Sequence, residues 1–101
     1  MEITLTTNNP NGLVQAFDEG AQAGELTFQI KEKVIVIDHT QTFKGFERRG
    51  IAEQMTLAAI DYAKTNHKKI IPECSYAYTY LMRHREYACV LDERVIDEKR
   101  Y

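Results

Sequence analysis

Hydrophobic and polar residues alternate through the first half of the chain with the two-residue period of β-strands. The clearest alternation would put Leu26, Phe28 and Ile30 on one face of a strand. Residues 34–37 are all β-branched, which is typical of a strand buried on both faces, and the polar residues 38–42 can extend that strand. Turn-forming residues separate these runs. The pattern predicts an antiparallel meander with strands at 13–17, 23–30 and 34–42.

The hydrophobic period changes to that of an α-helix in the second half of the chain. A short strand at 69–71, stopped by Pro72, and a second helix at 76–83 are expected after the first helix at 50–66. Strands followed by helix, strand and helix predict an α+β domain. The apolar residues of the first helix share one stripe, with polar residues opposite: Ile51, Met55, Ala58, Ala59, Tyr62 and Ala63.

Length and composition indicate one globular domain of 101 residues, in which residues 1–12 and 92–101 are peripheral and the charged 92–101 fray. A net charge of −2 argues against a nucleic-acid partner held by a broad basic face. The longest apolar runs have four residues, so we expect no membrane partner, and the first residues do not resemble a signal peptide. With only two cysteines as well, the chain is expected to be a reduced, cytoplasmic protein.

The segment 43–52 joins the buried strand to the start of the first helix and contains two glycines and two adjacent arginines. The first turn of a helix has unpaired N–H groups and about half a positive charge, which together favour anions. Gly50 would let an anion approach the backbone, and Arg48 and Arg49 could contact it. The alternative is a solvent-exposed loop that binds no anion, in which the glycines only form turns. From the residues alone, both interpretations remain open.

Five short motifs occur in a fixed order over residues 13–91. They are Gly24-Glu25-Leu26, His39-Thr40, Glu47-Arg48-Arg49-Gly50-Ile51-Ala52, Pro72-Glu73-Cys74 and His84-Arg85-Glu86-Tyr87. This set resembles the small single-domain GNAT-like (GCN5-related) N-acetyltransferases that lack the N-terminal helices. The third motif looks like their acetyl-CoA pyrophosphate loop, Q/R-x-x-G-x-G/A. The chain departs from the pattern at Glu47, where Gln or Arg is usual, and at Arg48, where glycine is frequent.

The resemblance implies a truncated GNAT fold and an acetyltransferase that uses acetyl-CoA as co-substrate without a metal. An amine, either a small amine or a protein lysine, would attack the thioester directly. The pantetheine arm would pair with the open edge of the strand that ends at Thr40, Gln41 and Thr42, where an amide would polarise the carbonyl. The pyrophosphate would rest on the backbone amides of Arg48, Arg49, Gly50, Ile51 and Ala52.

Three side chains are candidates for proton transfer. His39 could take a proton from an ammonium group, since histidine ordinarily titrates near neutral pH. Cys74 stands beside a helix start, where a thiolate is favoured, and could converge with His39 across the splayed strands. Tyr80 could protonate the leaving thiolate, by resemblance. The alternatives are a hydrogen-bonded surface histidine, a packed cysteine and a packed tyrosine, and Cys89 is expected in the core. The spacing of His and Cys gives no zinc motif.

Two other classes of function stay open at this point. The chain could be a non-catalytic CoA-binding module or a protein-interaction module on the same fold. It could also be a plain interaction domain whose glycine-containing loop is fortuitous.

Overall fold

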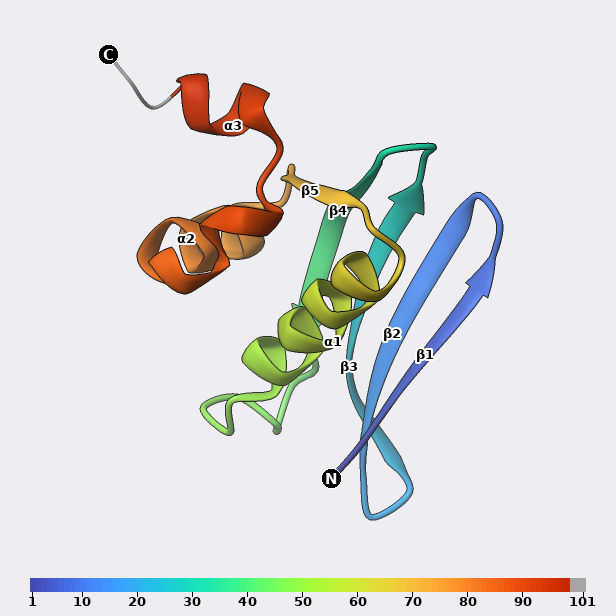
Figure 1. Cartoon of the computed structure of the whole chain (residues 1–101). Coiled ribbons are helices and arrows are strands. Elements are labelled where there is room, and N and C mark those ends of the chain that lie inside the picture. The colour runs from blue at the N-terminus through green and yellow to red at the C-terminus, as the bar shows by residue number, and fades with distance from the viewer. Residues whose placement is uncertain (99–101) are drawn as a thin grey trace.

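The computed structural model describes residues 1–98, with side chains up to residue 95. In this part of the chain five strands form one sheet in sequence order, with β1–β4 antiparallel and β5 parallel to β4. Helix α1 lies across one face of the sheet, and α2 lies beside the β5 edge (Figure 1). The α+β prediction is confirmed. The elements are β1 (Glu2–Asn8), β2 (Asn11–Asp18), β3 (Ala21–Ile30), β4 (Val34–Thr42), α1 (Ile51–Thr65), β5 (Lys69–Pro72), α2 (Ser75–Arg83), the 3-10 helix η1 (Arg85–Val90) and α3 (Glu93–Glu98).

The three strands predicted for the first half lie within β2, β3 and β4. Residues 1–12 also contain an edge strand, β1, which pairs with β2 from Glu2↔Phe17 to Asn8↔Asn11. Ile3 and Leu5 of β1 are half-buried against the core. The segment expected to be peripheral therefore completes one side of the sheet.

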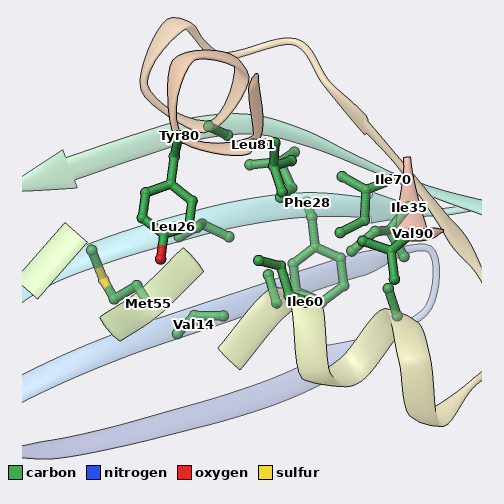
Figure 2. Close-up of a cluster of buried hydrophobic side chains, with 14 of the residues drawn as sticks. Val14, Leu26, Phe28, Ile35, Met55, Ile60, Ile70, Tyr80, Leu81 and Val90 are labelled. Atoms are coloured by element: carbon green, nitrogen blue, oxygen red, sulfur yellow. The ribbon is translucent and has the colours of Figure 1, made fainter. Parts of the chain in front are cut away.

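The core lies between α1 and the sheet and continues to α2. Leu26 and Phe28 of β3 meet Met55 and Ile60 of α1, with Tyr80 of α2 closing one end (Figure 2). The predicted stripe of α1 is buried at its centre and half-buried at Ala58 and Tyr62. Thr56 and Ile60 are buried too, although they stand outside that stripe, because the strands and η1 contact α1 on more than one side. The Thr56 hydroxyl donates to the Ala52 carbonyl at 2.8 Å, so its burial leaves no polar group unsatisfied.

A β-bulge interrupts the pairing of β3 and β4. Thr27 pairs with His39 and Phe28 pairs with Ile37, so Asp38 is one residue extra. At a bulge two successive side chains oppose one partner residue, and they point to the same side of the sheet. Thr27 alternates with the buried Leu26 and Phe28, so it faces away from α1. Asp38 and His39 therefore share the face opposite α1, which we call the open face.

The chain beyond η1 differs from the sequence-based expectation. Residues 93–98 form α3 rather than a frayed end, and Val95 is buried. The Asp92 N–H donates to Ile70 of β5, and its carboxylate accepts from the Arg94 guanidinium and N–H, which lowers the pKa of Asp92. Residues 99–101 of the expected frayed end lie outside the described residues.

Cys89, expected in the core, is exposed. It lies in the tight 3-10 turn of η1, where Val90 is the residue turned inward. The Cys89 carbonyl accepts a hydrogen bond from the Lys69 ammonium group. None of the described helices is both long enough and apolar enough to cross a membrane.

Candidate functional site

β4 and β5 pair over a short distance and then separate. Their ladder runs from Val34↔Lys69 to Ile37↔Pro72. The Ile37 carbonyl then accepts the N–H groups of both Glu73 and Cys74, at 2.9 and 3.0 Å, where the chain turns away into α2. In the part of the chain that the structure describes, β4 continues to Thr42 while paired with β3 alone. The last part of β4 thus has one free edge.

The backbone of Thr40 and Thr42 faces this free edge. The Phe43 N–H donates to the Ala23 carbonyl at 2.8 Å, so Phe43 faces β3. Successive residues of a strand direct their N–H and C=O groups to alternate sides. Gln41 therefore faces β3, and Thr40 and Thr42 present donors and acceptors to the edge. An extended chain with amide groups can bind there as an added strand does.

Cys74 lies at the point where the two strands separate. Its Sγ atom is 3.2 Å from the Thr40 hydroxyl, and either atom can donate. The same sulfur caps α2 by accepting the Ala77 N–H at 3.3 Å. Thr40 pairs with the buried Leu26, so this contact lies on the α1 side of the sheet.

His39 lies on the open face, across the strand from Cys74. His39 and Thr40 are successive residues without a bulge between them, so their side chains point to opposite faces. The His39 Nε2 atom is 3.5 Å from Glu25 Oε2, and the histidine side chain is 46% exposed. The structure therefore does not bring His39 and Cys74 together as expected, because strand alternation separates them.

The loop before α1 leaves the first turn of that helix without a side-chain cap. The N-cap residue, Gly50, has a left-handed backbone with φ 73°, and no described side chain caps the helix there. The first helical bond runs from the Gln54 N–H to the Gly50 carbonyl at 3.0 Å. The N–H groups of Ile51, Ala52 and Glu53 precede that bond and are directed out of the helix end, where an anion can accept them.

The two arginines of the loop have different surroundings. Arg49 donates to Asp18 at 2.6 Å and lies 5.5 Å from the centre of the Phe46 ring, so it ties the loop to the β2–β3 turn. Arg48 is exposed and has φ 66°, a conformation that glycine adopts without strain. The Glu47 carboxylate accepts the Gly45 N–H at 2.8 Å.

Tyr80 has a partner for its hydroxyl group. Tyr80 is 7% exposed, and its hydroxyl donates to Glu53 in the first turn of α1 at 2.9 Å. Burial, followed by this hydrogen bond and the charge of Glu53, raises the pKa of Tyr80 well above its usual value. The ring stacks on His84 at 4.0 Å between centroids and on Tyr76 at 6.1 Å. These contacts favour the packing interpretation of Tyr80 over proton donation.

Several residues of the site could not be found by sequence reasoning. Three candidate residues have acidic partners that are distant in sequence. Arg49 pairs with Asp18, His39 with Glu25 and Tyr80 with Glu53. Asp38 and His39 share the open face only because of the bulge. In the described part of the chain, no three His, Cys, Asp or Glu side chains gather closely enough to hold a metal ion.

The chain is similar to known proteins in sequence and in fold. The family described as GCN5-related N-acetyl-transferase matches residues 14–90. An NMR structure of a GCN5-like protein from Staphylococcus aureus, with N-acetyltransferase as its proposed activity, has a TM-score of 0.65 and 24% identity. The match covers 88% of this chain and 87% of that one.

A crystal structure of a GNAT-family protein from Staphylococcus aureus subsp. aureus, with acetyltransferase as its proposed activity, has a TM-score of 0.56 and 21% identity. That match covers 62% of this chain and 55% of the other. At these identities the two structures show a shared fold. No curated protein matches the chain.

Proposed function

Because the chain belongs to the GCN5-related N-acetyltransferase family, we propose that it transfers an acetyl group from acetyl-CoA to an amine. The observation that carries this proposal is the separation of β4 from β5, together with the uncapped start of α1 that follows the end of β4 along the chain. The free edge of β4 offers alternating amide partners to a pantetheine arm, and the helix start offers N–H groups to a pyrophosphate.

The residues around the helix start fit such a ligand. Gly50 has no side chain to cover the first-turn amides, and Ala52, two residues further on, has a small one. Arg48 adds an exposed positive charge, while Arg49 and Asp18 hold the loop against the β2–β3 turn. The residues from Arg48 to Ala52 would hold the pyrophosphate, and those from Thr40 to Thr42 the pantetheine arm.

In the proposed reaction the amine nitrogen attacks the carbonyl carbon of the thioester. A C–N bond forms, the C–S bond breaks, the amine proton passes to His39, and the sulfur leaves as a thiolate that takes a proton from water. His39 fits the role of base because its ring is accessible on the open face, with the Glu25 carboxylate 3.5 Å from its Nε2 atom. An N–H group of the free β4 edge, either that of Thr40 next to His39 or that of Thr42, would donate to the carbonyl oxygen as negative charge develops there.

Cys74 lies on the other side of β4 from His39, with its Sγ atom 3.2 Å from the Thr40 hydroxyl, so it does not stand beside the amine that His39 would deprotonate. The cytoplasmic location and the identity of the amine stay predictions.

We expect CoA and acetyl-CoA to stabilise the protein against heat. At a free concentration 100 times Kd, a ligand that binds only the folded state adds about 2.7 kcal/mol. For a domain of this size the midpoint of thermal unfolding should rise by roughly 10 °C or more. Pantetheine, which lacks the pyrophosphate, is the matched control and should give a much smaller shift. If neither CoA nor acetyl-CoA moves the midpoint, the proposed function is wrong.

Substituting His39→Gln should lower acetyl transfer by about 100-fold without changing CoA binding, since removal of a general base costs this much. Thiol release with an amine acceptor measures transfer, and calorimetry measures binding. His67→Asn, in the exposed turn that follows α1, is the matched control and should keep full activity. Cys74→Ser retains a capping atom for α2, so it tests the sulfur without unfolding the helix.

Equal rates for His39→Gln and the unchanged protein would remove His39 from the mechanism. CoA binding without any thiol release, over a broad set of amines, would instead support the non-catalytic CoA-binding module.

A further inference from the structure

The open face of the sheet contains a pocket of about 460 Å³. It lies over strands β1, β2 and β3 and reaches β4 at Asp38, the bulge residue. The residues that matter for its chemistry are Thr6, Asn8, Asn11, Leu13, Gln29 and Asp38. Among the described residues, no lysine or arginine lines it. The pocket is therefore electrostatically suited to a cation rather than to the anionic acyl donor.

The pocket has two polar ends with an apolar surface between them. The register places Thr6 opposite Leu13, Leu13 opposite Thr27, and Thr27 beside the bulge. β1 and β4 are three strand spacings apart, which is about 14 Å. At the β4 end stands the exposed carboxylate of Asp38, held by the Thr27 hydroxyl at 2.6 Å. At the far end stand the amides of Asn8 and Asn11, beside the β1–β2 turn.

The charged end of the pocket adjoins the candidate base. Asp38 and His39 are successive residues that share the open face because both oppose Thr27. An ammonium group bound by Asp38 would therefore lie next to the imidazole ring, with Glu25 on the ring's other side. These two carboxylates attract a cation and disfavour an acidic acceptor.

We propose that this pocket binds a linear aliphatic polyamine and presents its Asp38-bound amino group to His39 for acetylation. The inference rests on the proposed function. The hydrocarbon chain lies on Leu13, and a second amino group reaches the amides of Asn8 and Asn11. A single protein lysine would leave that second polar end without a cation, so the free polyamine fits better. His39 takes one proton from the bound ammonium group, and the neutral nitrogen then attacks the thioester carbon. The amide C–N bond forms as the C–S bond breaks, and the second nitrogen proton passes through water to the thiolate. The acetylated end is uncharged, so it loses its ion pair with Asp38 and leaves.

Binding of spermidine to the intact chain tests the pocket without any acyl donor. We expect the amide NMR signals of Thr6, Leu13, Thr27 and Asp38 to shift on titration, and calorimetry to show tighter binding of spermidine than of butylamine. Asp38→Asn keeps the shape and an acceptor for Thr27 but removes the charge, so Kd should rise about tenfold. Asp61→Asn, an exposed aspartate on α1 outside this pocket, should leave Kd unchanged.

A second variant places a cation inside the pocket. Thr6→Arg changes an exposed residue of the edge strand and should weaken spermidine binding by a similar factor, whereas Thr65→Arg adds the same charge on α1 and should not. Equal spermidine affinity in Asp38→Asn, Thr6→Arg and the unchanged chain would overturn the proposal that this pocket binds a polyamine. So would acetylation of a lysine-containing peptide at the same rate in all three.

The failure of the pocket and the failure of the proposed function are distinguishable. If spermidine binding depends on Asp38 but the chain does not bind CoA, the polyamine-binding proposal is supported and the proposed acetyltransferase function is wrong. If the chain binds CoA and releases thiol with other amines but does not bind spermidine, the proposed acetyltransferase function is supported and the polyamine-binding proposal is wrong.

Discussion

Substituting Phe28→Ala is expected to lower the free energy of unfolding by about 4 kcal/mol. The Phe28 side chain is 1% exposed and lies between the sheet and α1, with its ring centroid 5.3 Å from that of Tyr62. It also covers Gly12, where a Cβ atom would lie 2.2 Å from the ring. Removing the ring leaves a cavity where it now packs against Tyr62 and against Gly12. A domain of this size has only about 5–10 kcal/mol of stability, so roughly half would be lost.

Urea unfolding followed by circular dichroism measures this change, and Phe17→Ala is the matched control. Phe17 is half-buried at the end of β2, so its removal should cost about 1 kcal/mol. Gly12→Ala approaches the same contact from the other strand and should also destabilise the protein, because the ring must move. A loss below about 1.5 kcal/mol for Phe28→Ala would show that the core closes over the vacancy.

Substituting Ala52→Glu is expected to weaken CoA binding by about 100-fold while the fold remains at least as stable. A carboxylate in the first turn of α1 favours the helix, because it complements the helix dipole. The same carboxylate would stand about 6 Å from a pyrophosphate on the first-turn amides. At an effective dielectric constant near 20, that repulsion is about 3 kcal/mol, which corresponds to the 100-fold loss. Calorimetry measures the affinity, and urea unfolding measures the stability.

The matched control is Gln54→Glu, which adds the same charge to an exposed residue of the same helix. The Gln54 N–H already bonds to the Gly50 carbonyl, so it lies beyond the free amides. Its CoA affinity should change by less than about threefold, since an exposed charge at that distance is screened by salt. If Ala52→Glu binds CoA as tightly as the unchanged protein, the pyrophosphate does not rest on the α1 N-terminus.

Most of the fold could be predicted from hydrophobic periodicity. The alternation at Leu26, Phe28 and Ile30 and the helical spacing of Ile51 and Met55 each locate a buried face directly. β1 was harder to predict. Only Ile3 and Leu5 alternate there, and an edge strand packs too weakly to impose a strong pattern. The pattern contains no signal for the bulge at Asp38, because a bulge depends on pairing with another strand.

The segments that form the candidate site could be predicted from the sequence, but their arrangement in three dimensions could not. Gly50 and the start of α1 lie where the segment 43–52 indicated. The faces of His39 and Cys74 depend on the register of β4, which the local sequence does not determine. The partners of Arg49 and Tyr80, namely Asp18 and Glu53, come from distant segments, so only the folded chain reveals them.

The order of the strands has a consequence for how the chain folds. β1 to β4 pair with their sequence neighbours, so their contacts close short loops, whereas β5 can join β4 only after the 26 residues from Phe43 to Lys68 have been crossed. We expect the meander to gain protection from hydrogen exchange before β5 and α2 do. The gap between β4 and β5 would then be the last feature to form, and CoA should protect the late-forming C-terminal elements most.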